Sequence, residues 1–257
     1  MKKEIQIFFT AVMYFTRIPC PKWIGHSQEY LTKCSRYFPL VGIIIGAIGG
    51  LVYYGCSFIF PHAIAILLSM ISTILVTGAF HEDGLADMFD GFGGGWKKDD
   101  ILRIMKDSRI GTYGVVGLCS VLALKFCCLF VIDSKFIFPV SIVGHSFSRF
   151  VTCTLMYHLD YVRDDGQTKP NIKEVSLTSL ITAAFFGITP LVLLVSKTRF
   201  PLIKLVVLLI AVLIARWYLG RFFKKWIGGQ TGDCCGATQQ IGEVVIYLSL
   251  VVVWKYI

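Results

Sequence analysis

Long apolar stretches constrain this chain most. Residues 38–60 carry no charged side chain, and further apolar stretches follow. About 20 apolar residues are needed for a helix to cross a bilayer, and backbone groups in lipid must be hydrogen-bonded within the protein. We therefore predict an all-α, polytopic integral membrane bundle of about seven spans. These spans are residues 38–60, 63–80, 113–132, 136–156, 175–195, 202–219 and 241–254.

The N-terminal segment is apolar but too short to span. Ile5, Phe8, Val12 and Phe15 recur at helical spacing within residues 4–18. A short helix with one apolar face lies in the plane of the membrane interface. We predict an interfacial helix there.

Composition agrees with a membrane protein: 55% of the residues are hydrophobic, 16% are charged, and the mean hydropathy is +0.69. The net charge of +9 does not indicate nucleic-acid binding, because the basic residues are scattered between apolar stretches and build no continuous face. The nine cysteines show no CxxC spacing and are interpreted as small apolar packing residues.

Basic residues instead predict the orientation of the chain in its membrane. With the N-terminus inside, the basic segments 2–36, 97–109, 163–173 and 216–225 all fall on the cytoplasmic side, as lysine and arginine generally do. Residues 157–173 then form a cytosolic loop. The expected location is the cytoplasmic membrane, with the polar segments facing the cytoplasm.

Seven of the sixteen acidic residues lie within residues 81–112. In a helix, Asp83, Asp87 and Asp90 share one face, at i, i+4 and i+7. Neighbouring anions repel, so a bound cation is expected between them, with Glu82 as a further ligand. Oxygen ligands favour a hard ion, which makes Mg²⁺ the first choice and Mn²⁺ the second.

The same segment carries features that suit a phosphate or a nucleotide. Gly93, Gly94 and Gly95 permit close approach of the backbone, and Lys106 and Arg109 supply positive charge. Acidic, glycine and basic residues together indicate metal-assisted phosphate chemistry. A solvated loop of mixed charge and a cation path in a transporter are the alternatives.

A second polar segment lies at residues 221–240. Its flexible loop, which ends at Asp233, carries Gly229 and Gly232, so it offers backbone amides to a phosphate and one more carboxylate to a metal. Arg149 adds a charge at membrane depth, where ionisable residues mark sites. Both segments face the same compartment, so residues 1–257 are expected to form one membrane-embedded catalytic domain.

Five motifs connect these observations. They are FFTAVMYFTRIP, YFPLVGIIIG, HEDGLADMFDGFGGG, IMKDSRIGTYG and GGQTGDCCGATQQ. In this order and spacing the chain resembles the cobalamin synthase family, the adenosylcobinamide-GDP ribazoletransferases, over nearly its whole length. At Glu82 the family often has an apolar residue, so Glu82 is a weaker metal candidate than the aspartates.

The resemblance implies a reaction and its partners. The ribose 3'-hydroxyl of α-ribazole, or of its 5'-phosphate, would attack the cobinamide-side phosphate of adenosylcobinamide-GDP. GMP would leave, and adenosylcobalamin or its 5'-phosphate would form. Asp107 and Asp233 are then candidates for the base or for further metal ligands, without a ranking between them. Lys106, Arg109 and Arg149 would hold phosphate oxygens.

Two other functions stay open at this stage. The dipeptides Asp83-Gly84 and Asp90-Gly91 also look like the CDP-alcohol phosphotransferase pattern, so a phospholipid synthase is one alternative. Asp87, however, stands where that pattern has an arginine. A membrane cation transporter is the other, but it should carry acidic groups inside its spans, and those predicted here are nearly free of them. A homo-oligomer is also open, since the glycines of residues 38–60 could pack within one chain or between two.

Overall fold

The computed structural model describes residues 2–25, 27–162, 175–198 and 201–256; residues 163–173 of the predicted cytosolic loop lie outside this part. The described residues form helices joined by short turns, without a strand. In chain order these helices are α1 (Lys2–Phe15), α2 (Gln28–Lys33), η1 (Cys34–Tyr37), α3 (Phe38–Ser57), α4 (His62–Thr77), α5 (Phe80–Gly94), α6 (Lys98–Ile104), α7 (Thr112–Val131), η2 (Ser134–Phe136), α8 (Ile137–His158), α9 (Leu177–Thr198), α10 (Leu202–Ile227) and α11 (Gly232–Tyr256).

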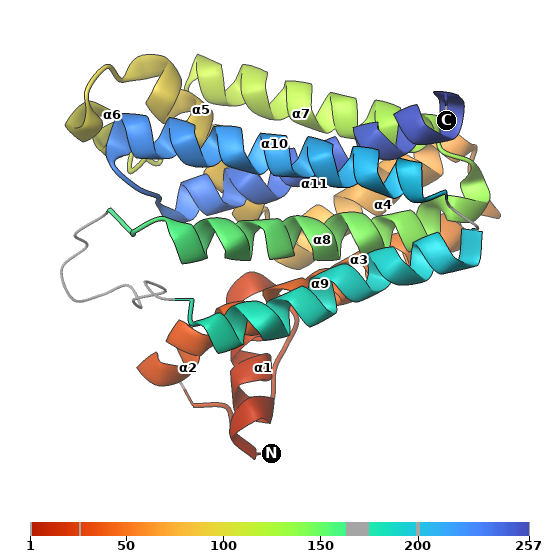
Figure 1. Ribbon diagram of the computed structural model, residues 1–257, viewed down its shortest axis with the longest axis horizontal. Coiled ribbons are helices and arrows are strands. Elements are labelled where there is room, and N and C mark those ends of the chain that lie inside the picture. Colours follow the sequence, from red (N-terminus) through yellow and green to blue (C-terminus); the bar gives the residue numbers. More distant parts are fainter. Residues whose placement is uncertain (1, 26, 163–174, 199–200, 257) are drawn as a thin grey trace.

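The long helices run side by side along one axis (Figure 1). Within the described residues, six helical segments are long and apolar enough to cross a membrane, and a seventh is added if α4 and α5 count as one bent span. The predicted all-α membrane bundle is therefore confirmed. Helices α8 and α11 lie at the centre of the bundle. In the most apolar stretch of each, 72% of the residues are buried, whereas the value for α10 is 17%.

Helix α1 lies across the bundle axis, beside the start of α3 (Figure 1). This is the orientation expected of an interfacial helix. Its apolar face is buried through Ile7, Ala11 and Phe15, and the Phe15 ring stacks on Phe38 with a centroid separation of 4.1 Å. The N-terminal segment is thereby attached to the first spanning helix.

The glycines of α3 pack within this chain. A Cβ atom built on Gly42 or Gly46 would collide with the backbone of α8, and one built on Gly49 would lie 2.7 Å from the Thr73 side chain on α4. Small residues allow such close helix approach in membranes. Close packing of these glycines inside one subunit removes them as support for an oligomer.

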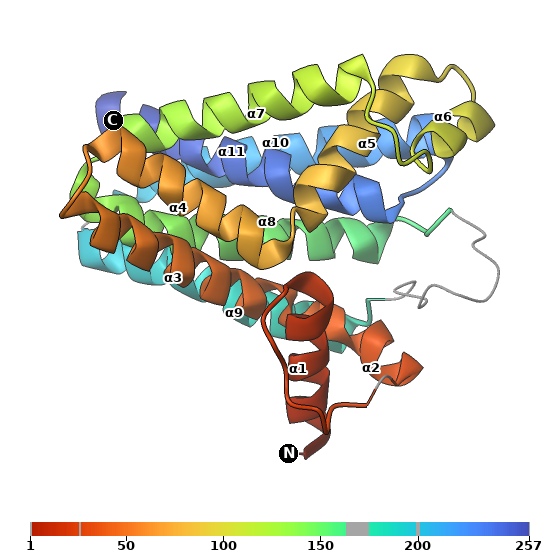
Figure 2. The ribbon, with the colours of Figure 1, turned by 180° about the vertical axis from the view of Figure 1, so that it is seen from behind.

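Helices α4 and α5 meet at an angle of 89°, which Figure 2 shows from behind. Gly78 (φ 65°) and Ala79 (φ 58°) both adopt the left-handed conformation and end α4. A Cβ atom on Gly78 would also collide with the Arg17 side chain. The backbone N–H of Arg17 donates to the carbonyl of Val76 (2.7 Å). This break directs the acidic segment across the end of the bundle.

The C-terminal helix differs from the prediction. A short span at 241–254 and a preceding loop were expected, but α11 begins at Gly232. The Thr231 hydroxyl accepts from the N–H of Cys234 (3.3 Å) near the start of the helix. Gln239, Gln240 and Glu243 can then be helical inside the bundle because side chains on other helices hydrogen-bond or ion-pair with them.

Candidate functional site

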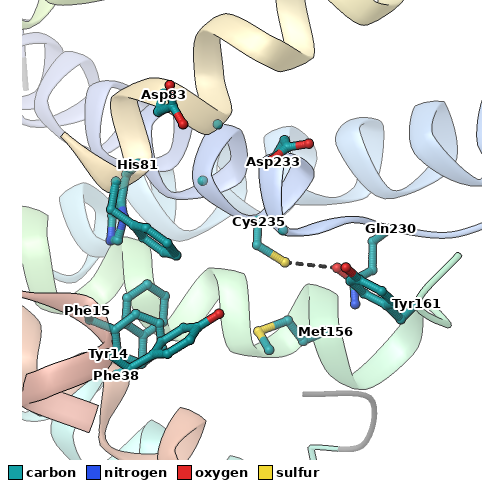
Figure 3. Close-up of a pocket in the computed structure, with 14 residues that line it drawn as sticks. Tyr14, Phe15, Phe38, His81, Asp83, Met156, Tyr161, Gln230, Asp233 and Cys235 are labelled. Carbon is teal, nitrogen blue, oxygen red and sulfur yellow. Dashed lines mark hydrogen bonds between the residues drawn. The ribbon is translucent and has the colours of Figure 1, made fainter. Parts of the chain in front are cut away.

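A pocket opens at the end of the bundle where α1, α3, α5 and α11 come together (Figure 3). It encloses about 350 Å³. Asp83 of α5 and Asp233 of α11 both line it, so the two polar segments that are far apart in sequence meet here. The lining residues are Tyr14, Phe15, Phe38, Phe80, His81, Asp83, Gly84, Met156, Tyr161, Gln230, Gly232, Asp233, Cys235 and Gly236.

Two glycines let α5 and α11 cross closely enough to bring these carboxylates together. A Cβ atom on Gly84 would lie 3.0 Å from the Cα atom of Asp233, and one on Gly236 would lie 3.1 Å from the carbonyl oxygen of His81. Beside this contact, the Gln240 side-chain amide donates to Glu82 Oε1 at 2.7 Å. Backbone contact and the buried bond between Gln240 and Glu82 thus hold the crossing.

The four proposed metal ligands have different surroundings. Asp83 is exposed at the pocket, and Asp87 lies one turn further along α5, half-buried and outside the pocket lining. Glu82 is buried and bonded to Gln240. Among the described residues, no group of three His, Cys, Asp or Glu side chains is arranged to hold a metal ion. The metal site stays a prediction.

Asp90 faces α7. Its two carboxylate oxygens accept from the backbone N–H groups of Gly111 (2.7 Å) and Gly114 (2.8 Å). A carboxylate at a helix N-terminus satisfies N–H groups that have no partner within the helix and interacts favourably with the helix dipole. The structure therefore gives Asp90 a packing role that the helical spacing did not indicate.

Lys106, Asp107 and Arg109 lie between α6 and α7, outside the pocket lining. The Arg109 guanidinium donates to both oxygens of Asp107, to Oδ1 at 3.1 Å and to Oδ2 at 2.7 Å, and lowers the pKa of that carboxyl to about 2. Lys106 is exposed. Of the two candidate bases, only Asp233 lies at the pocket with Asp83.

The predicted substrate-binding glycines fall into two groups. Gly93, Gly94 and Gly95 end α5, where added Cβ atoms would contact Tyr113, Ile104 and Ile101 respectively, so they serve packing against α6 and α7. Gly229 and Gly232 lie near the start of α11. Gly232 lines the pocket, and a Cβ atom added to it would have no neighbour within 4 Å.

Gly229 lies directly against the carbonyl of Asp160, where no side chain would fit. Next to it, Gln230 exchanges backbone hydrogen bonds with Asp160 (2.9 Å) and Val162 (3.1 Å), which attaches the end of α8 to the start of α11. The Cys235 thiol donates to the Gln230 side chain at 3.0 Å (Figure 3). This side of the pocket is therefore built by local backbone pairing.

Arg149 is only 1% exposed and lies within α8, away from the pocket lining. Its guanidinium donates to the carbonyl of His145 (2.9 Å) and stands 5.3 Å from the ring centroid of Phe38. It belongs to a buried polar region behind the pocket.

The centre of that region was missed in the sequence. Glu243 of α11, with no exposed side-chain surface, pairs with Lys125 of α7 at 2.7 Å. Gln239 (2.8 Å) and Tyr247 (3.0 Å) also donate to its carboxylate. Glu243 stands at the start of the predicted span 241–254, and the longer α11 places it inside the bundle. A lysine and a glutamate inside apolar stretches were the available signal.

The arrangement defines a class of protein: a polytopic helical membrane protein with a carboxylate-bearing pocket at one end of its bundle. Within that class, the family model described as Cobalamin-5-phosphate synthase matches residues 7–251. The chain belongs to this family, as its motifs indicated, and the family assignment disfavours the phospholipid synthase and the cation transporter.

Relatives in several bacteria are similar over nearly their whole length. Proteins named adenosylcobinamide-GDP ribazoletransferase are 45% identical in Shewanella frigidimarina (98% of this chain, 96% of the relative) and 38% identical in Leptospira biflexa (98% and 97%). The protein of that name in Ralstonia pickettii is 41% identical (97% and 96%). No solved structure matches the chain.

Proposed function

We propose that this protein transfers the phospho-cobinamide group of adenosylcobinamide-GDP to α-ribazole or its 5'-phosphate. The nucleoside 3'-oxygen bonds to the cobinamide-side phosphorus, the bond between that phosphorus and the GMP oxygen breaks, and GMP leaves. The observation that carries the proposal is that Asp83 and Asp233, 150 positions apart, line one pocket in a member of this family.

Asp233 is the better candidate for the base. It lies at the start of α11 beside Asp83, whereas Asp107 is paired with Arg109 elsewhere. A carboxylate there takes the proton from the attacking hydroxyl or orients it. The N-terminal end of α11 also faces the pocket through Gly232, and helix N-termini favour phosphate groups.

The donor set fits Mg²⁺ in the manner usual for phosphoryl transfer. Magnesium is commonly held by one or two carboxylates together with substrate phosphates and water, so a cage of protein ligands is not needed. Asp83, with Asp87 one turn away, would hold it, and Mn²⁺ would bind the same oxygens. When bound, the ion neutralises charge on the diphosphate and on the departing GMP.

The pocket faces the cytoplasm in this proposal, and the membrane is the cytoplasmic membrane. The end of the bundle that bears the pocket also carries α6, with Lys98 and Arg103, and the C-terminal end of α10, with Lys224 and Lys225 (Figure 1). Lysine and arginine concentrate on the cytoplasmic side of membrane proteins.

GMP release from adenosylcobinamide-GDP tests the proposal. Detergent-solubilised protein is given this donor and α-ribazole, with Mg²⁺, with Mn²⁺ or with a chelator. We expect metal-dependent GMP release that falls about 100-fold or more in Asp83→Asn and Asp233→Asn.

Asp133→Asn is the matched control. Asp133 is an aspartate at the other end of the bundle, so its substitution should leave GMP release unchanged. Absence of release from folded wild-type protein would overturn the reaction. Undiminished release by Asp83→Asn would overturn the metal-holding role.

A further inference from the structure

Aromatic side chains form the wall of the pocket opposite the two carboxylates. Asp83 and Asp233 lie on one side in Figure 3, and Tyr14, Phe15 and Phe38 on the other. Phe15 stacks on Phe38, and Phe80 meets Tyr14 and Phe15 edge to face, with centroids 5.7 and 6.3 Å away. Such a wall offers ring faces and edges to a flat, apolar ligand.

His81 is part of this aromatic wall. Its ring meets Phe38 at 5.4 Å and Phe80 at 5.3 Å, both at steep angles. The side chain is 1% exposed, and within the described part of the chain neither of its ring nitrogens has a hydrogen-bonding partner. Buried polar groups are almost always paired, and both nitrogens have almost no accessible surface, so the ring must turn toward the pocket for a ligand to supply the missing partner.

We propose that this wall, Tyr14, Phe15, Phe38, Phe80 and His81, binds the base of the nucleoside acceptor. The inference rests on the function proposed above. The base packs against the aromatic rings, and the His81 imidazole hydrogen-bonds the ring nitrogen that the glycosidic bond leaves free. The ribose then points across the pocket, so that its 3'-hydroxyl reaches Asp233.

The chemistry of the wall favours this base over the guanine of the donor. A benzimidazole base is flat, mostly carbon, and has one free ring nitrogen, which one imidazole can satisfy. Guanine carries several donors and acceptors on its edges, and burying them against phenyl rings would leave them unpaired. The cavity of about 350 Å³ also suits one nucleoside and is too small for a whole corrinoid.

Direct binding of α-ribazole to the full-length, detergent-solubilised protein tests the inference. Equilibrium dialysis compares wild type with Phe80→Ala, which shortens the wall at a ring that is 44% exposed, and with His81→Phe, which keeps a ring but removes its nitrogens. We expect the Kd for α-ribazole to rise about tenfold in each variant. The KM for adenosylcobinamide-GDP should stay unchanged.

Phe58→Ala is the matched control, because Phe58 is 71% exposed at the turn after α3, at the other end of the bundle. An unchanged Kd for α-ribazole in Phe80→Ala overturns the inference, even if His81→Phe does not fold. A raised KM for the donor instead of the acceptor also overturns it. Binding of α-ribazole that depends on the wall, without GMP release, would keep this inference and refute the proposed reaction. GMP release by the wild type, together with an unchanged Kd for α-ribazole in Phe80→Ala, would support the proposed reaction and refute this inference.

Discussion

Lys125 and Glu243 form an ion pair of 2.7 Å between α7 and α11, with 3% and 0% of the respective side chains exposed. Removing one member of a buried pair leaves an uncompensated charge, which costs about 3–5 kcal/mol. We therefore expect Glu243→Gln to lower the thermal unfolding midpoint strongly in detergent.

The double variant Lys125→Met with Glu243→Gln is the control for this pair. It removes both charges, while the new amide oxygen can accept from Gln239 and the new amide N–H can donate to the Tyr247 hydroxyl. Most of the lost stability should return, because burying a neutral pair requires less desolvation. A single variant as stable as wild type would contradict the uncompensated-charge argument.

Glu82 is expected to position α5 and to hold no metal ion. Glu82→Gln can still accept from Gln240 and should retain activity with an unchanged Mg²⁺ concentration for half-maximal rate. Glu82→Ala leaves the Gln240 amide unpaired and should lower stability by about 1–3 kcal/mol. If Glu82→Gln requires much more Mg²⁺, the side chain is a ligand after all.

The contact between Gly84 and Asp233 predicts a strong effect of a single methyl group. Gly84→Ala places a Cβ atom 3.0 Å from the Cα of Asp233 and 3.2 Å from its carbonyl oxygen, so the two helices must separate. We expect a loss of about 1–3 kcal/mol in stability and a large fall in GMP release.

Gly55→Ala tests whether any glycine substitution would do the same. Gly55 lies in α3 with nothing within 4 Å of its Cβ position. The change should be neutral or stabilise by up to about 1 kcal/mol, because alanine favours helix. Equal activity loss in both variants would refute the crossing argument.

Asp107 predicts a pH dependence confined to acid. Arg109 lowers its pKa from 3.8 to about 2. A depressed pKa means that the folded state favours the charged form, so this stabilisation is present above pH 4 and is lost as pH falls toward 2. The stability difference between wild type and Asp107→Asn should shrink across that window in acid-unfolding curves. A difference that stays constant would count against the pair.

Much of the fold followed from the sequence because bilayers impose it. Apolar stretches such as residues 38–60 must be helical in lipid, and a three- to four-residue period places Asp83 and Asp87 on one face. The family motifs, spread over the chain, identified its relatives. These signals come either from residues close together in the sequence or from motifs that the chain shares with its family.

Only the tertiary structure decided which residues meet. Asp90 shares a helix face with Asp83 and Asp87 but bonds to the N-terminal end of α7, and Glu243 lies inside a helix whose polar start resembled a loop. The meeting of Asp83 with Asp233, and of both with the aromatic wall, depends on the crossing of α5 and α11 and on the docking of α1. Periodicity describes neighbours along one helix, whereas contacts between helices depend on side-chain volume and on backbone breaks such as Gly78 and Ala79.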